Sequence, residues 1–115
     1  MTQAQCEIVI VGAGAAGLMA ACTAAEHGLP ALVLERKHQP GRKWLMCGNN
    51  RCNIAPNADL PQLLRDYDDP VGPFLKTALR AFGPRDLCNW FRSQGVPTVA
   101  HSDGRIFPGS ENADD

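Results

Sequence analysis

Three glycines near the N-terminus have the spacing of a phosphate-binding turn. Gly12, Gly14 and Gly17 form a G-x-G-x-x-G pattern. The first glycine permits a tight turn, the second lets the backbone approach a pyrophosphate, and the third allows close helix–sheet packing. Amides at the positive end of the helix dipole then bind the phosphates. The residues expected to contact a dinucleotide are Gly12, Ala13, Gly14, Ala15, Ala16 and Gly17.

A carboxylate follows the glycine turn at the distance that a ribose contact requires. Glu35 lies 18 positions beyond Gly17. Its carboxylate can accept hydrogen bonds from ribose hydroxyls and would repel a 2′-phosphate, which favours FAD or NAD over NADP. The adjacent Arg36 weakens that repulsion, and Glu35 and Arg36 are both expected to contact the cofactor. The alternative is a structural glycine turn with a surface glutamate, which the strand–turn–helix context disfavours.

The elements that position these residues follow from the hydrophobic pattern. The β-branched run 7–11 predicts a strand covered on both faces. The alanine-rich segment 18–27 has high helix propensity and ends at Gly28, and the run 31–34 predicts a second buried strand. Strand, turn, helix and strand within about 30 residues make a βαβ unit.

Periodicity is lost from residue 36 to residue 61, which predicts a long, ordered loop. Gly41, Arg42 and Lys43 lie near its start. Arg42 offers a bidentate fork and Lys43 a point charge, and both are suited to a diphosphate or to the polar edge of a flavin. The alternative is a solvated basic turn.

A second polar cluster occupies residues 47–53 of this loop. Glycine permits close backbone approach, asparagines supply donors and acceptors, and arginine supplies a positive fork, so the cluster can hold a flavin's pyrimidine edge or ribityl chain. The alternative is a turn held by asparagine side chains. The expected cofactor contacts are Gly48, Asn49, Arg51, Cys52 and Asn53.

Cys47 and Cys52 are separated by four residues, the spacing of the redox pair in flavin disulfide reductases. A thiolate at either position could attack a disulfide and relay electrons from a flavin. The sequence distance from Glu35 is longer than in those enzymes, and no helix begins here, so a scaffolding role is favoured. The remaining cysteines are expected in the core: Cys6, Cys22 and Cys88.

The second half of the chain predicts two helices and a hairpin. The helices cover 73–82 and 84–95, and strands at 96–100 and 106–107 flank an Asp-Gly turn. His101 is expected at the surface, and the chain ends without a packed closing element. No zinc site is expected, because Cys-x-x-Cys is absent and the histidines lack ligand spacing.

Composition limits the class of protein. With 115 residues and a net charge of -1, the chain is long enough for one domain and lacks the basic footprint of a nucleic-acid-binding protein. No apolar run approaches the roughly 18 residues of a membrane span. Five cysteines without an export signal favour the cytoplasm. The expected partners are a small-molecule cofactor and substrate.

The sequence resembles the N-terminal part of the BaiN/YhiN-like family of bacterial flavoproteins, which are NAD(P)/FAD-dependent oxidoreductases or aminoacetone-oxidase-like enzymes. The resemblance extends over nearly the whole chain. It is carried by the glycine turn with residues 18–21, by Glu35-Arg36, and by the segments 40–43, 48–49, 51–53 and 104–108. It departs from the family at Cys47, where serine is usual, at Asn50, where glycine is usual, and at Ala55-Pro56, where threonine and asparagine are usual.

The resemblance implies an α/β fold, a partial Rossmann-type (glutathione-reductase-like) FAD-binding domain with a βαβ start, a long loop, helices and a short β-hairpin. It implies that the glycine turn binds the pyrophosphate, that Glu35 binds the ribose and that residues 42–53 line the flavin. NAD(P)H would be the electron donor of the parent enzyme.

Family members are several times longer than this chain. Residues 1–115 are therefore expected to be the N-terminal part of an FAD-binding domain, without the later flavin-domain segment and inserted domains, and to have weak or no activity alone. No catalytic acid or base is assigned. The alternatives are a flavin-linked disulfide reductase using Cys47 and Cys52, and a non-catalytic dinucleotide-binding module.

Overall fold

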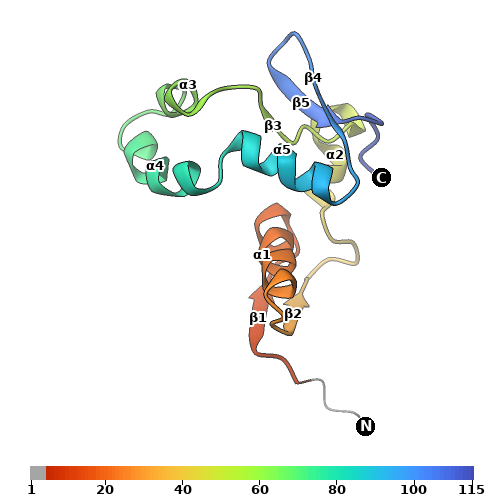
Figure 1. Ribbon diagram of the computed structural model, residues 1–115. Coiled ribbons are helices and arrows are strands. Elements are labelled where there is room, and N and C mark those ends of the chain that lie inside the picture. Colours follow the sequence, from red (N-terminus) through yellow and green to blue (C-terminus); the bar gives the residue numbers. More distant parts are fainter. Residues whose placement is uncertain (1–4) are drawn as a thin grey trace. The chain divides into compact units, whose positions relative to one another are not determined.

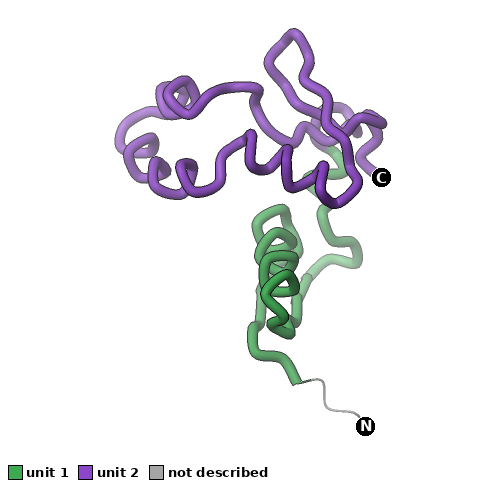
Figure 2. The backbone as a smooth tube through the Cα atoms, in the orientation of Figure 1, with its two compact units in different colours: residues 1–46 green, residues 47–115 purple. Residues whose placement is uncertain are grey.

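The computed structural model describes residues 5–115, in two compact units that divide between residues 46 and 47 (Figure 2). In the first unit, the elements are β1 (Ile8–Val11), α1 (Ala15–Glu26) and β2 (Ala31–Leu34) (Figure 1). A kinked helix, α2 (Arg42–Asn50), crosses the division. The second unit continues with β3 (Ala55–Pro56), α3 (Leu60–Arg65), α4 (Val71–Ala81), α5 (Pro84–Ser93), β4 (Thr98–Ala100) and β5 (Arg105–Pro108).

The first unit is the predicted βαβ unit. β1 and β2 pair in parallel, from Ile8 opposite Ala31 to Val11 opposite Leu34. α1 connects them and starts at Ala15, within the glycine turn 12–17 and earlier than the alanine-rich segment suggested. Gly28, with φ of +71°, follows the end of α1 as predicted. The sequence therefore predicted this unit closely.

Within residues 5–115, the strands of this unit are covered on one face only, so the described chain does not itself supply the expected coverage of both faces. α1 packs on both strands. Side chains alternate along each strand, so the residues that face away from α1 are exposed: Val9, Val11, Leu32 and Leu34, with Val11 at 85%. Cys6 is also exposed, because it precedes β1, and its predicted core position is wrong.

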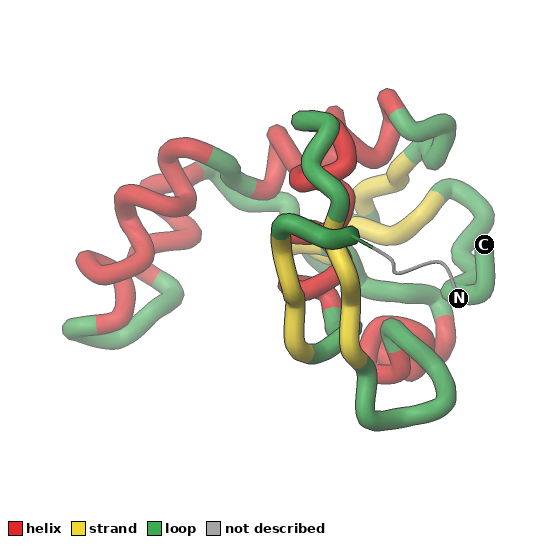
Figure 3. The backbone as a smooth tube through the Cα atoms, turned by 90° about the horizontal axis from the view of Figure 1, so that it is seen from below, coloured by secondary structure: helices red, strands yellow, loops and turns green. Residues whose placement is uncertain are grey.

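The second unit contains a three-stranded antiparallel sheet in the order β3-β5-β4 (Figure 3). β4 and β5 form the predicted hairpin, with Val99 opposite Phe107 and with Gly104 at φ of +81° in the turn. β3 was not predicted, because its two residues, one of them proline, carry no periodic signal. Ala55 pairs with Ile106 and so brings the long loop to the hairpin.

The helices of the second unit confirm two predictions and correct one. α4 and α5 correspond to the predicted helices, and Pro84 occupies the first position of α5. The segment 36–61 contains the whole of the kinked helix α2 and the start of α3, so the prediction of a loop throughout is wrong. α3 is short, and the Asp59 side chain caps it by accepting a hydrogen bond from the Gln62 amide at 2.8 Å.

Phe107 is completely buried and is the largest fully buried side chain in the described part of the chain. Buried Cys52, Cys88 and Ile106 also belong to the core of this unit. The C-terminal segment also packs, since the Ala113 amide donates to the carbonyl oxygen of Asn50 at 3.0 Å, so the expectation of an unpacked end is wrong. Among the described helices, none combines the length and apolar character that a bilayer crossing needs.

Candidate functional site

The glycine turn 12–17 runs from the end of β1 into the first turn of α1, with the geometry that its sequence predicts. Gly12 has φ of +97°, and its amide donates to the Leu34 carbonyl oxygen at 2.7 Å. Gly14 is the extended N-cap residue of α1. A Cβ atom on Gly17 would overlap the carbonyl oxygen of Gly12, whereas a Cβ on Gly14 would meet no atom within 4 Å. Gly17 therefore serves close packing, and Gly14 borders open space.

The N-terminus of α1 presents free backbone donors. The first helical hydrogen bond of α1 is donated by the Leu18 amide to the Gly14 carbonyl oxygen, at 2.9 Å. The amides of Ala15, Ala16 and Gly17 precede it and have no intrahelical acceptor. Within residues 5–115, no side chain caps this end, and its first turn has no acidic residue. The arrangement suits an anion.

Glu35 directly follows β2 and faces the glycine turn. Its Oε2 accepts a hydrogen bond from the Ala13 amide at 2.7 Å, and its Oε1 accepts one from the Lys37 amide at 2.7 Å. Hydrogen bonds from the backbone of Lys37 and then of Ala13 lower the pKa of this carboxyl. The side chain is thus an oriented carboxylate at the sheet edge where ribose hydroxyls are bound in Rossmann-type sites.

The start of the following loop is tied to the same turn. The Gly41 amide donates to the carbonyl oxygen of Ala13 at 2.8 Å, and Gly41 has φ of +65°. Arg36, Arg42 and Lys43 are exposed, and none of the three forms an ion pair within the described chain. In the first unit, the structure thus brings the glycine turn, Glu35 and Gly41 together and leaves the three cations at the surface.

The polar cluster 47–53 belongs to the second unit and has an unusual backbone. Gly48, Asn49, Asn50 and Cys52 all have φ between +58° and +62°. A Cβ on Gly48 would lie 2.7 Å from the Cε1 atom of Phe107, so only glycine fits against that ring. Such left-handed residues cost free energy and concentrate at functional sites.

Arg51 is held inside this cluster by three contacts. Its Nε donates to the Gly48 carbonyl oxygen at 3.1 Å, and its Nη1 lies 3.3 Å from Oε2 of Glu111. Its guanidinium stands 4.5 Å above the Phe107 ring centroid. The charge of Arg51 is therefore largely engaged in shaping the loop, and its contact with a flavin stays a prediction.

Glu111 and His101 complete this arrangement and were not identified from the sequence. His101 Nε2 lies 2.6 Å from Oε1 of Glu111, and the hydrogen bond from His101, followed by that from Arg51, lowers the pKa of Glu111. His101 is half-buried, with its ring 4.9 Å from that of Phe107, so it lies only partly at the surface where it was expected. Sixty positions separate Arg51 from Glu111, and no local signal connects them.

The two cysteines of the cluster are close together. The Cys52 amide donates to the Cys47 carbonyl oxygen at 3.1 Å, and the Cys47 thiol lies 3.7 Å from the Asn53 carbonyl oxygen. Burial, with a smaller effect of the neighbouring Cys47 thiol, raises the pKa of Cys52 to about 11. Asn53 adds a buried Oδ1 atom that no described donor reaches.

Comparison with known proteins identifies the family. Residues 6–115 match the family model of the HI0933-like protein Rossmann domain. The chain belongs to the HI0933-like family. This confirms the Rossmann-type α/β fold that the sequence predicted and the resemblance to the BaiN/YhiN-like flavoproteins.

Curated relatives of this HI0933-like chain carry two different names. It is 35% identical over 108 residues to a 3-dehydro-bile acid delta(4,6)-reductase of Clostridium scindens, covering 92% of this chain and 25% of that protein. It is 32% identical over 106 residues to a ribosomal RNA dihydrouridine synthase of Escherichia coli, covering 88% and 24%. A protein of the same name from Haemophilus influenzae is 32% identical over 101 residues. The chain spans about a quarter of the length of these relatives.

Proposed function

We propose that this chain is the FAD-binding N-terminal portion of an NAD(P)/FAD-dependent oxidoreductase. The observation that carries the proposal is the hydrogen bond from the Ala13 amide to Glu35, which fixes a carboxylate beside an uncapped helix N-terminus. A dinucleotide needs these two features together, a donor set for its phosphates and an acceptor for its ribose.

The proposed assignment divides the cofactor among the residues of the first unit. The amides of Ala15, Ala16 and Gly17 would bind the pyrophosphate, which approaches over the open side of Gly14. Each carboxylate oxygen of Glu35 accepts one backbone hydrogen bond and retains a lone pair for a ribose hydroxyl. A 2′-phosphate would face this negative charge, so FAD is preferred over NADP.

The cluster 47–53 is proposed to contact the flavin. Exposed Asn49 and the left-handed backbone around it offer amide donors and acceptors, while Arg51 and Phe107 hold the loop in shape. When bound, FAD supplies the capacity to accept and donate hydride. The names of the relatives indicate different substrates, so only the redox class is carried over, with NAD(P)H as the proposed electron donor.

The experiment is a spectrum of the freshly purified protein followed by parallel titrations with FAD, ADP and NAD. Flavin absorption, or a saturable response to FAD that is stronger than the response to ADP, supports the proposal. Binding of ADP or NAD with no response to FAD would favour the non-catalytic dinucleotide-binding module. Loss of FAD binding in Glu35→Gln, with retained secondary structure, would assign the ribose contact to this carboxylate.

A flavin-linked disulfide reductase is the second candidate, because Cys47 and Cys52 lie close together. The raised pKa of Cys52 opposes it, since a protonated thiol is a poor nucleophile. The test is the activity of the protein on a small disulfide in the presence of FAD and NAD(P)H. Turnover that disappears in both Cys47→Ser and Cys52→Ser, with FAD still bound, would establish this candidate instead.

A further inference from the structure

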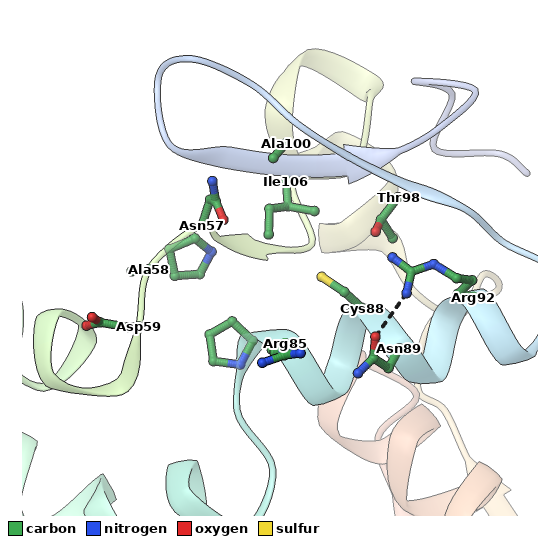
Figure 4. Close-up of a pocket in the computed structure, with 12 residues that line it drawn as sticks. Asn57, Ala58, Asp59, Arg85, Cys88, Asn89, Arg92, Thr98, Ala100 and Ile106 are labelled. Carbon is green, nitrogen blue, oxygen red and sulfur yellow. Dashed lines mark hydrogen bonds between the residues drawn. The ribbon is translucent and has the colours of Figure 1, made fainter.

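A cavity of about 540 Å³ lies between α5 and the sheet of the second unit (Figure 4). Its volume is in the range of small-molecule sites. Ile106 and Ala100 line it from the sheet, and Arg85, Asn89 and Arg92 line it from α5. It includes none of residues 12–17, Glu35 or the cluster 47–53, so the proposed cofactor site does not account for it.

Both arginines of the cavity lining lie on one face of α5. Arg85, Cys88, Asn89 and Arg92 follow the i, i+3, i+4, i+7 spacing that places side chains on one side of a helix. Figure 4 shows Asn89 between the two arginines. The sequence thus presents two guanidinium groups, two turns of helix apart, to the same hollow.

The positive charge of these arginines is not neutralised by a described carboxylate. Arg92 Nη1 donates to Oδ1 of Asn89 at 3.0 Å, and an amide carries no net charge. The side chain of Arg85 forms neither a hydrogen bond nor an ion pair with any residue in the described range. Asp59 is the one acidic residue of the lining, and its Oδ1 is engaged in capping α3.

We infer that this cavity binds a small organic anion, whose phosphate or carboxylate group lies between Arg85 and Arg92 and whose apolar part packs on Ile106 and Ala100. Arginine forks suit both anionic groups, because each offers oxygens at the spacing of paired N–H donors. Asn89 and half-buried Thr98 add neutral polar groups that can orient the ligand.

The test titrates the full chain with phenyl phosphate, benzoate and neutral benzamide, observed by calorimetry and by backbone amide resonances. We expect saturable binding of at least one anion, with shifts confined to α5 and the β3-β5-β4 sheet, and no binding of benzamide. The anion that binds with the higher affinity shows whether the site prefers a phosphate or a carboxylate. No saturable binding of either anion below about 10 mM would overturn the inference.

Two variants make the test specific. Arg85→Gln combined with Arg92→Gln is expected to weaken binding at least about tenfold, since hydrogen bonds between charged groups are the strong ones. The control combines Lys76→Gln with Arg80→Gln, which also removes two positive charges, from exposed residues of α4 outside the cavity. Equal weakening in the control would overturn the inference. Because the replaced side chains are exposed, the substitutions should leave the core intact. A far-ultraviolet circular dichroism spectrum of each variant checks this.

Discussion

The Ala13 amide and the Glu35 carboxylate, 22 positions apart, are joined by a hydrogen bond of 2.7 Å. The second oxygen of Glu35 accepts the Lys37 amide, so the side chain connects the glycine turn to the chain that leaves β2. One carboxylate therefore both stabilises the turn and faces the place where a dinucleotide ribose would lie. Its two roles can be separated by pH and by substitution.

Lowering the pH is expected to loosen the first unit through Glu35. The folded protein holds the pKa of this carboxyl below its ordinary value of 4.5, chiefly by the Lys37 and Ala13 hydrogen bonds. A lowered carboxyl pKa contributes stability that is present above the unfolded pKa and lost as the pH falls through the folded one. Thermal unfolding of wild type and Glu35→Gln from pH 7 to pH 3 measures this contribution.

Wild type should lose stability more steeply than Glu35→Gln below pH 4.5. Asp103 and Glu111 also have lowered pKa values, but they are present in both proteins and cancel in the comparison. Parallel curves for the two proteins throughout this window would contradict the role of Glu35.

Alanine at position 14 should chiefly lower FAD affinity, whereas alanine at position 17 should chiefly lower stability. Gly14 has φ of -80° and no atom within 4 Å of an added Cβ, so Gly14→Ala should change stability by less than about 0.5 kcal/mol. Its methyl group would obstruct the pyrophosphate and lower FAD affinity at least about tenfold. Gly17→Ala forces the Gly12 carbonyl group away and should cost about 1–3 kcal/mol.

Urea unfolding and FAD fluorescence quenching distinguish these two effects. An unchanged FAD affinity in folded Gly14→Ala would contradict the assigned approach of the pyrophosphate, whatever the result for Gly17→Ala.

The first unit could be predicted because its signals are local. The glycine spacing, the two apolar runs and Glu35 all lie within about 30 residues of sequence. The second unit depends on distant partners. Nothing near Arg51 in the sequence indicates that Glu111 pairs with it, and a strand as short as β3 exists only because β5 lies beside it. The exposure of Val11 depends on what lies over the sheet, which a strand pattern alone does not specify.

Cys52 should react slowly with alkylating reagents. Burial, with help from Cys47, raises its pKa to about 11, so only about one thiol in a thousand is ionised at pH 8. Peptide mass spectrometry after iodoacetamide treatment at pH 8 should find Cys6, which is exposed, modified well before Cys52. Equally fast modification of the two would remove the objection to dithiol chemistry.

Glycine at position 50 should stabilise the cluster 47–53. Asn50 has φ of +62°, a conformation that glycine adopts without steric cost and asparagine adopts with little. Asn50→Gly should therefore gain up to about 0.5 kcal/mol, while Asn50→Ala should lose about 1 kcal/mol. Urea unfolding measures both variants. A destabilised Asn50→Gly would indicate that the asparagine side chain makes a contact that outweighs the backbone strain.

The fit of Gly48 against Phe107 should appear as an energetic coupling between the two positions. An added Cβ at residue 48 would lie 2.7 Å from the Phe107 ring. The new alanine would also have to adopt the left-handed φ of +61° that Gly48 has. Gly48→Ala should thus cost about 3 kcal/mol, the sum of overpacking and backbone strain. Gly104→Ala, with φ of +81° and open space around its Cβ, is the matched control and should cost only the strain, about 1 kcal/mol.

Phe107→Leu removes the ring atoms that the new methyl group would meet. In that background the cost of Gly48→Ala should fall to about 1 kcal/mol, while the cost of Gly104→Ala should stay unchanged, since sites without shared partners add independently. Gly48→Ala could instead cost the same with phenylalanine and with leucine at position 107. That result would mean that the loop moves to accommodate the new methyl group and that the ring does not resist it. The backbone of the cluster 47–53 would then be adaptable and not fixed by its packing against Phe107.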